Sequence, residues 1–376
     1  MALQEFKCPS CGGTVKFNTD KQKMVCDFCG TEYEIENENF DHDQGHSHTH
    51  PREKEGTTKT ITTESGTYEH DQSYFSEEEE EGLKVYSCNS CGGEIVGDET
   101  IAATSCPFCN NNVVVPSQFE GDLKPDFIIP FKLDKDDAKK ALKKFYNGRR
   151  LLPKVFKDQN HIEEIKGIYV PFWLFSGDAH GEMVFRGTKI RTYSDSVYRY
   201  TETSYYEIER DGTMNFRYVP VDGSSKLDDV TMQSIEPYKW EEAMNFSTQY
   251  LPGFLANRYD VEAKEVIGVA EDRIKNSTMD SLQNSISGYS SLNLQKSRYN
   301  LGKVDIHYAL VPVWFLNTEW QGKFYAFVMN GQTGKIVGDD MPVDNRLRTK
   351  KLLTVTLILG VILFIIAYLV YPYLGR

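Results

Sequence analysis

Eight cysteines in two identical quartets constrain this chain more than any other feature of its sequence. Each quartet has the spacing C-x2-C-x14-C-x2-C, and the chain of 376 residues has no further cysteine. Two C-x-x-C turns joined by a hairpin bring four thiolates to the corners of a tetrahedron, which is the geometry that Zn²⁺ prefers. The spacing therefore predicts two structural zinc ions, each held in a small zinc ribbon. The expected ligands are Cys8, Cys11, Cys26 and Cys29 in the first ribbon, and Cys88, Cys91, Cys106 and Cys109 in the second.

The residue after the second cysteine of each pair supports a metal site. A turn that points backbone N–H groups at sulfur needs a residue that tolerates positive φ. Gly12, Gly30 and Gly92 hold this position in three pairs, and Asn110 holds it in the fourth. A redox dithiol or an iron–sulfur site is the alternative, but thioredoxin-like pairs belong beside a βαβ pattern, and hairpin-like residues surround these. Metal binding would supply most of the folding free energy of such small units, on the order of 10 kcal/mol.

Charge and composition divide the chain into six parts. Residues 37–82 hold 13 Asp or Glu against three Lys or Arg, so they carry −10 of the net charge of −13. With so few aliphatic residues, this segment is predicted to be a disordered acidic linker. The expected parts are ribbon 1 (1–36), the linker (37–82), ribbon 2 (83–119), a larger body (120–340), a basic collar (341–351) and a membrane helix (352–373).

The segment 352–373 reads LLTVTLILGVILFIIAYLVYPY and has no charged residue. About 20 apolar residues span a bilayer as a helix, whereas a buried core helix of a soluble protein would have a polar face. Four basic residues precede the segment: Arg346, Arg348, Lys350 and Lys351. Because positive charge stays on the cytoplasmic side, the sequence predicts a single-pass protein of the cell membrane. The bulk of its chain would be in the cytoplasm (N-in, C-out), and the N-terminus shows no signal peptide.

The body is predicted to be α+β and rich in antiparallel sheet. Residues 134–148 and 260–284 show helical periodicity, and Asp134 can cap the first of these helices. Aromatic and β-branched runs between and after them predict strands. YVPFWLF and LVPVWFL share a proline and a tryptophan at a constant offset of 141, since Trp173 matches Trp314. This repeat predicts two related halves, residues 120–222 and 223–340.

The cysteine segments carry a resemblance. FKCPSCGG…MVCDFCG and YSCNSCGG…SCPFC resemble rubredoxin-type zinc ribbons of the TFIIB class. The whole arrangement is similar to a bacterial family of TFIIB-type zinc-ribbon-containing membrane proteins, with paired ribbons, an α+β body and a terminal membrane segment. The resemblance implies a membrane-bound member of envelope-stress assemblies, alongside phage-shock-type and flotillin-like proteins. Only the eight cysteines carry over as functional positions.

The charge of the ribbons bears on what they bind. Ribbon 1 has four Lys against six Asp or Glu, and a zinc ion with four thiolates adds about −2. Nucleic-acid binding demands a basic patch, which neither ribbon has. We therefore expect protein partners, other membrane-associated stress proteins among them, and no nucleic acid. The expected function is that of a membrane-anchored scaffold or adaptor; the alternatives are a membrane-tethered nucleic-acid-binding regulator and a zinc or redox sensor.

The remaining polar clusters predict little chemistry. No phosphate-binding loop, H-E-x-x-H or G-x-S-x-G motif is present, so we do not expect an enzyme. His46, His48 and His50 alternate along an extended stretch of the linker. They could hold a transition metal weakly, or form a solvated tract. His161, His180 and His307 have no nucleophile partner in the sequence and are expected to be surface or core residues.

Overall fold

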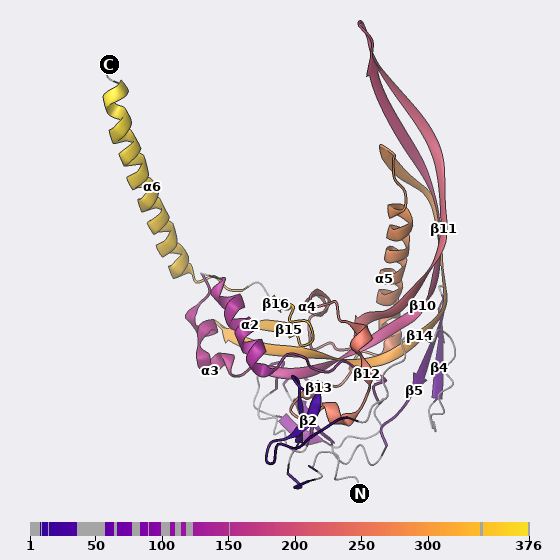
Figure 1. The fold of residues 1–376 in the computed structure, drawn as a ribbon, viewed down its shortest axis with the longest axis vertical. Helices are drawn as coiled ribbons and strands as arrows, with labels where there is room; N and C mark the ends of the chain where they lie inside the picture. The colour runs from indigo at the N-terminus through magenta and orange to yellow at the C-terminus, as the bar shows by residue number, and fades with distance from the viewer. Residues whose placement is uncertain are drawn as a thin grey trace.

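The structure, a computed structural model, describes residues 8, 10–13, 15–35, 57–63, 66–76, 83–88, 90–98, 106–109, 114–117, 123–149, 151–338 and 341–374. As predicted, the fold is mixed α+β and rich in sheet. Most strands belong to one 13-stranded sheet, and a separate three-stranded sheet lies near the N-terminus. Helix α6 (Asn345–Leu374) projects away from the sheet (Figure 1).

Two long antiparallel strands form the centre of the large sheet. β10 (Lys166–Ser194) pairs with β14 (Ser291–Trp320) over more than 20 residues. Two short strands flank them in parallel, β9 (Phe127–Ile128) on β14 and β13 (Leu255–Asn257) on β10. The sheet is extended by β11 (Arg199–Asp222) on β10, and by β15 (Lys323–Asn330) and then β16 (Ile336–Gly338) beyond β14. Short connecting elements are α3 (Gln159–Ile162), α4 (Asp229–Ser234), β12 (Met244–Asn245) and the 3-10 turns Lys154–Lys157, Trp240–Glu242 and Thr248–Tyr250.

The outer parts of β10, β11 and β14 extend far beyond the body as a twisted arm, residues 177–216 and 263–304 (Figure 1). Helix α5 (Ala263–Asn284) covers one face of the arm. Met183 and Phe185 of β10 pack there with Leu282 in a small core of their own. Gly181 permits the close approach, because a Cβ at this position would lie 2.9 Å from Leu282. β10 runs through this region without a break, from Lys166 to Ser194.

Both predicted body helices form. α2 (Lys135–Asn147) begins after Asp134, whose side chain accepts a hydrogen bond from the Asp137 N–H at 2.7 Å. α5 covers most of the range predicted for the second helix. α6 begins before the apolar run, so residues 345–351 of the basic collar form its first turns. Among the described residues, α6 is the one helix that is long and apolar enough to cross a membrane.

The predicted disorder of the linker 37–82 is wrong for part of its length. β4 (Thr57–Thr62) and β5 (Thr67–Gln72) form a hairpin, and β5 pairs in parallel with β14 at Lys303–Ile306. The Thr-rich segment has β-branched residues that suit a strand, and Tyr68 is fully buried. The composition of the segment did not indicate β5, because some of its hydrogen-bond partners come from β14, which is far away in the sequence. Residues 37–56 lie outside the described residues.

The same tryptophan contact occurs twice, 141 residues apart. The Trp173 indole N–H donates to the Val261 carbonyl at 2.8 Å, two residues before α5 begins. The Trp314 indole N–H donates to the Leu133 carbonyl at 3.0 Å, two residues before α2 begins. The prolines at the same offset of 141 each accept a backbone hydrogen bond from a glycine: Gly223 N–H donates to Pro171 O at 3.0 Å, and Gly331 N–H donates to Pro312 O at 2.8 Å.

A buried carboxyl marks one of these turns. Asp222 accepts a hydrogen bond from the Ser224 N–H at 3.1 Å, as Asn330 does from the Gln332 N–H at 2.9 Å. The second carboxyl oxygen of Asp222 is buried without a hydrogen-bond partner. Burial raises the pKa of Asp222 to about 8. The folded protein therefore holds a proton on Asp222 at pH values where the unfolded chain has lost it.

We expect Trp173→Phe and Trp314→Phe to destabilise the chain to a similar extent, by about 2 kcal/mol each. Each change removes one indole hydrogen bond and leaves a small cavity. Thermal unfolding of the detergent-solubilised protein, followed by circular dichroism, measures both. A native melting profile for one variant and a large loss for the other would contradict the equivalence of the two contacts.

The raised pKa of Asp222 makes stability depend on pH. The stabilising contribution is complete below the pKa of the unfolded carboxyl, about 3.9, and is lost as pH rises through about 8. Asp222→Asn removes this term and copies the residue found at position 330. The free energy of unfolding of Asp222→Asn, measured relative to that of the native chain, should increase by at least about 1.4 kcal/mol from about pH 5 to about pH 8. One pKa unit corresponds to that free energy. Parallel pH profiles of the two proteins would argue against a buried, protonated Asp222.

Candidate metal centres and the surfaces around them

Ribbon 1 brings its four cysteines together at the end of a small sheet. β1 (Val15–Asn18), β2 (Lys23–Cys26) and β3 (Glu32–Tyr33) form the predicted hairpin and its extension. The Sγ atoms of Cys8 and Cys29 lie 3.5 Å apart, and those of Cys11 and Cys26 lie 3.6 Å apart. All four Sγ atoms lie within 4.8 Å of one another.

Ribbon 2 has the same geometry. β6 (Leu83–Cys88) pairs with β7 (Glu94–Asp98) and β8 (Val114–Ser117). The Sγ–Sγ distances are 3.6 Å for Cys88–Cys109 and 3.6 Å for Cys91–Cys106. Four thiolates at the usual Zn–S distance form a tetrahedron with edges of about 3.8 Å, and all eight cysteines are free of disulfides. Both quartets therefore fit a zinc ion.

Glycine shapes three of the four cysteine turns as the sequence predicted. Gly12, Gly30 and Gly92 have φ of 70°, 72° and 66°. Each donates its N–H to the carbonyl of the first cysteine of its pair, at 2.8–3.0 Å. Asn110, the predicted equivalent in the fourth turn, lies outside the described residues.

The second glycine of each CGG has a different purpose, which sequence reasoning missed. A Cβ at Gly13 would lie 2.7 Å from the Phe28 ring, and one at Gly93 would lie 2.9 Å from the Phe108 ring. Each phenylalanine directly precedes the last cysteine of its quartet, in CDFC and CPFC. The recurrence of CGG with x-F-C was the signal that could have revealed this contact.

Local hydrogen bonds favour the thiolate form at some cysteines of each quartet, among them Cys29 and Cys88. The Thr31 hydroxyl and backbone N–H lower the pKa of Cys29 to about 6. Burial favours the neutral thiol at Cys88, but the N–H groups of Cys91 and Ser90 outweigh it and lower the pKa to about 7. The thiolate is the form that ligates metal. Burial raises the pKa of Cys91 and Cys106, and the neighbouring thiols raise that of Cys11 against the effect of the Gly13 N–H, so the shifts within each quartet go in both directions.

Both ribbons contact the body, and ribbon 2 is part of its sheet. β7 pairs with β13, so the predicted boundary at residue 119 runs through a continuous sheet. Ribbon 1 has a separate sheet and contacts the body through side chains: the Phe17 ring lies 5.2 Å from that of Tyr250, and the Gln22 side chain donates to the Phe131 carbonyl at 2.8 Å. The described parts of the ribbons are thus docked rather than carried on a free tether.

The two ribbons differ at the equivalent phenylalanines. Phe108 is 9% exposed. Its ring lies 6.4 Å from that of Phe315, and its carbonyl accepts a hydrogen bond from the Asn317 side chain at 2.6 Å. Phe28 is 77% exposed. The same side chain is thus buried by the body in one ribbon and open to solvent in the other.

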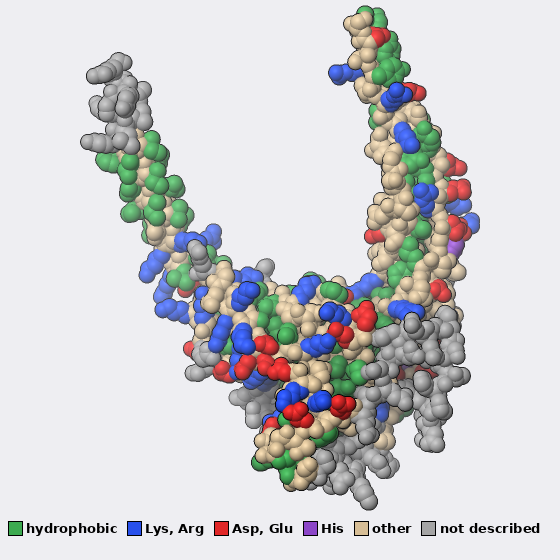
Figure 2. All heavy atoms as spheres, in the orientation of Figure 1, with side chains coloured by type: hydrophobic (Ala, Val, Ile, Leu, Met, Phe, Trp, Pro, Cys, Tyr) green, Lys and Arg blue, Asp and Glu red, His purple; other side chains and the backbone are tan. Residues whose placement is uncertain are grey.

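The other predicted residues have clear positions. His46, His48 and His50 lie outside the described residues. The basic residues Arg346, Arg348, Lys350 and Lys351 are in the first turns of α6, at the base of its apolar surface (Figure 2). His161 contacts Thr318 and Glu164 at 2.5 Å and 3.0 Å.

His180 lies on the arm with two carboxylates nearby. Its Nε2 is 3.7 Å from Glu182 and 3.6 Å from Asp211, and its Nδ1 is 3.2 Å from the Thr213 hydroxyl. The histidine and the two carboxylates are sufficiently close to share a cation. They are partly exposed, and salt bridges of this kind need no ion, so we assign none.

These features define a class: a protein with two four-cysteine sites that fit zinc, an α+β body and one C-terminal helix able to anchor it in a membrane. The chain is 30% identical over 333 residues to the uncharacterized protein YdjG of Bacillus subtilis (strain 168), and the match covers 89% of each chain. The chain belongs to the family of this protein. No known family profile and no solved structure matches it.

Loss of one ligand should affect the two ribbons differently. We expect Cys29→Ser and Cys109→Ser each to lower the zinc content from two ions per chain to one. Cys109→Ser should also destabilise the body by several kcal/mol, on the order of 3 or more, because ribbon 2 shares its sheet with β13. Elemental analysis and thermal unfolding measure the two effects. A native chain without zinc, or equal melting of both variants, would contradict this account.

Proposed function

We propose that the protein is a membrane-anchored zinc-ribbon adaptor that recruits protein partners to the cytoplasmic face of the cell membrane. The resemblance to TFIIB-type ribbon proteins of the membrane favours an envelope-stress setting. The observation that carries the proposal is the different environment of Phe28 and Phe108. Ribbon 2 buries its phenylalanine against the body, and ribbon 1 presents the equivalent side chain to solvent.

The contact of ribbon 2 suggests how ribbon 1 would bind a partner. Phe108 meets an aromatic ring and a side-chain amide on neighbouring positions of β14, Phe315 and Asn317. Exposed aromatic side chains are frequent anchors of protein interfaces. We infer that Phe28 docks into a partner surface of similar chemistry, an apolar patch with a side-chain or backbone donor beside it.

The charges of ribbon 1 favour a protein over a nucleic acid. Lys16 pairs with Asp27 at 2.6 Å, Lys23 pairs with Glu34 at 3.1 Å, and Lys21 pairs with Glu32. Every described lysine of the ribbon is therefore neutralised by a carboxylate. Phosphate binding would have to break these pairs, which leaves little driving force for a polyanion.

The arm offers a second docking surface. At its tip the rings of Tyr193 and Tyr200 stack at 5.3 Å, and the Tyr200 hydroxyl donates to Asp195 at 2.9 Å. Tyr198, Tyr205 and Tyr206 are also exposed. Tyrosines interspersed with basic residues are typical of protein interfaces, and Figure 2 shows apolar and charged side chains together along the arm.

Two finer features belong to the same proposal. The repeated contacts of Trp173 and Trp314, at one offset, support an origin of the body by duplication. The basic residues at the start of α6 support an orientation with the body in the cytoplasm.

The experiment is affinity purification of the full-length chain from native membranes, comparing Phe28→Ala with Phe108→Ala. Phe28→Ala should lose specific partners by about tenfold or more, which corresponds to an anchor of about 1.4 kcal/mol or more. It should retain two zinc ions and native melting, whereas Phe108→Ala should lower stability by about 3 kcal/mol. An unchanged set of partners for Phe28→Ala would remove the central support of the proposal.

A further inference from the structure

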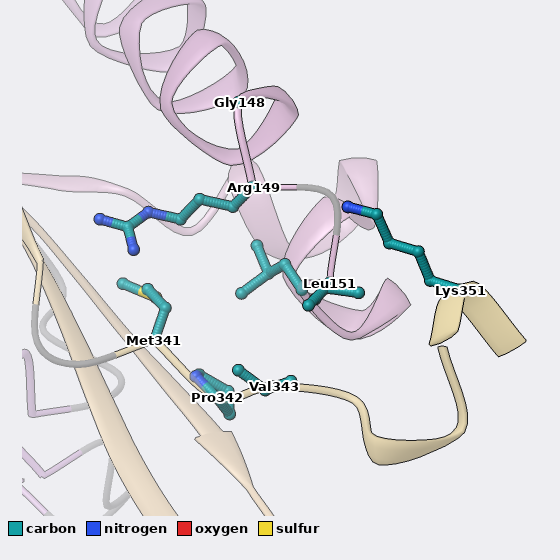
Figure 3. Close-up of a pocket in the computed structure, with 8 residues that line it drawn as sticks. Gly148, Arg149, Leu151, Met341, Pro342, Val343 and Lys351 are labelled. Atoms are coloured by element: carbon teal, nitrogen blue, oxygen red, sulfur yellow. The ribbon is translucent and has the colours of Figure 1, made fainter. Parts of the chain in front are cut away.

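A cavity of about 470 Å³ lies where the membrane helix meets the body (Figure 3). One wall follows the C-terminal end of α2, and the other is the segment that leads into α6. Its floor is apolar, formed by Leu151, Leu152, Met341 and Val343, and two cations, Arg149 and Lys351, line it as well. No carboxylate is among its described lining residues.

We propose that this cavity binds the headgroup of an anionic phospholipid. The phosphate would interact with Arg149 and Lys351, and the glycerol and first acyl carbons would cover the apolar floor. The cavity would recognise a phosphate anion attached to an apolar group. A lipid has both parts, whereas a soluble phosphate ester has the phosphate without the acyl chains. The inference rests on the membrane anchorage by α6 that is part of the proposed function, and it does not depend on partner recruitment.

The position of the cavity matches the headgroup layer. Lys351 directly precedes Leu352, the first residue of the uncharged run. Basic side chains at this level of a membrane helix lie among lipid phosphates. The cavity therefore opens at the depth where a headgroup is present whenever α6 spans the bilayer.

The cavity is fixed to the helix rather than placed beside it by chance. The Asp344 N–H donates to the Leu151 carbonyl at 2.8 Å, which joins the two walls. The Asp344 side chain then accepts the Arg346 N–H at 2.8 Å and so caps the start of α6. Both the apolar floor and the first turn of the helix are thus held by one residue.

The two cations suit a phosphate. The Arg149 guanidinium lies 4.5 Å from the centre of the Phe145 ring, which orients the side chain at the rim. Among the described residues, no carboxylate forms an ion pair with Arg149 or Lys351. In Figure 3 the two side chains lie on opposite sides of the apolar floor. Both are exposed and long, so they can turn toward one bound anion.

The test measures binding of fluorescent phosphatidylglycerol to the full-length protein in phosphatidylcholine nanodiscs. The variant Arg149→Gln/Lys351→Gln is compared with Arg348→Gln/Lys350→Gln, which removes the same charge from α6 and leaves the cavity intact. We expect the cavity variant to bind the lipid at least about tenfold more weakly than the control variant, because two charges next to the phosphate are lost. Equal weakening in both variants would mean diffuse attraction to the collar and would overturn the proposal.

Two further measurements test the same site. Val343→Trp fills the cavity without changing any charge and should also displace the lipid. Unchanged lipid binding by this variant would overturn the proposal. Soluble glycerol phosphate should compete poorly; binding as tight as that of the lipid would identify a soluble ester as the ligand and overturn the lipid assignment. Alkaline extraction of the same membranes shows separately whether α6 anchors the chain, so a failed anchor is distinguished from a failed site.

Discussion

The antiparallel pairing of β10 with β14 holds the described parts of this protein together. It brings Lys166 opposite Phe315 at one end and Thr188 opposite Ser291 at the other. The short strands β9 and β13 add to its two sides at positions 141 residues apart. Through β13 the pairing reaches ribbon 2, and through its outer half it forms the arm. A change that weakened this ladder would therefore affect both the zinc-binding and the extended parts of the chain.

Ribbons with nearly the same sequence acquire different roles from what surrounds them. Both have the glycine turn and the phenylalanine that covers the second glycine. Ribbon 2 lies against Phe315 and Asn317 and becomes part of the body. Ribbon 1 contacts the body through Phe17 and Gln22, and the cysteine turn that carries Phe28 remains exposed to solvent. A duplicated module can thus supply one internal brace and one free surface without a change in its own fold.

The sequence predicted the features that depend on local chemistry. Cysteine spacing, the positive-φ glycines, the Asp134 cap and the uncharged helix are all readable from short segments, and the structure contains them. It did not predict features that depend on distant partners. The strand β5 was hidden in an acidic, polar segment because β14 supplies its neighbour, and the exposure of Phe28 could not be distinguished from the burial of Phe108. The close packing of α5 on β10 at Gly181 is another contact between segments that are distant in the sequence.

The arm and α6 leave the body on the same side (Figure 1). Among the described residues, α6 is the helix that is long and apolar enough to cross a bilayer. The arm carries Glu182, Asp211 and Arg298, with only partial pairing. Each such charge costs about 2.5 kcal/mol or more at the centre of a membrane. These charges favour water over a bilayer as the surroundings of this part of the arm. Because α6 is attached to the body through Asp344 and Leu151, the cavity at the start of α6 is joined directly to the body, with ribbon 1 at the end of the body away from α6.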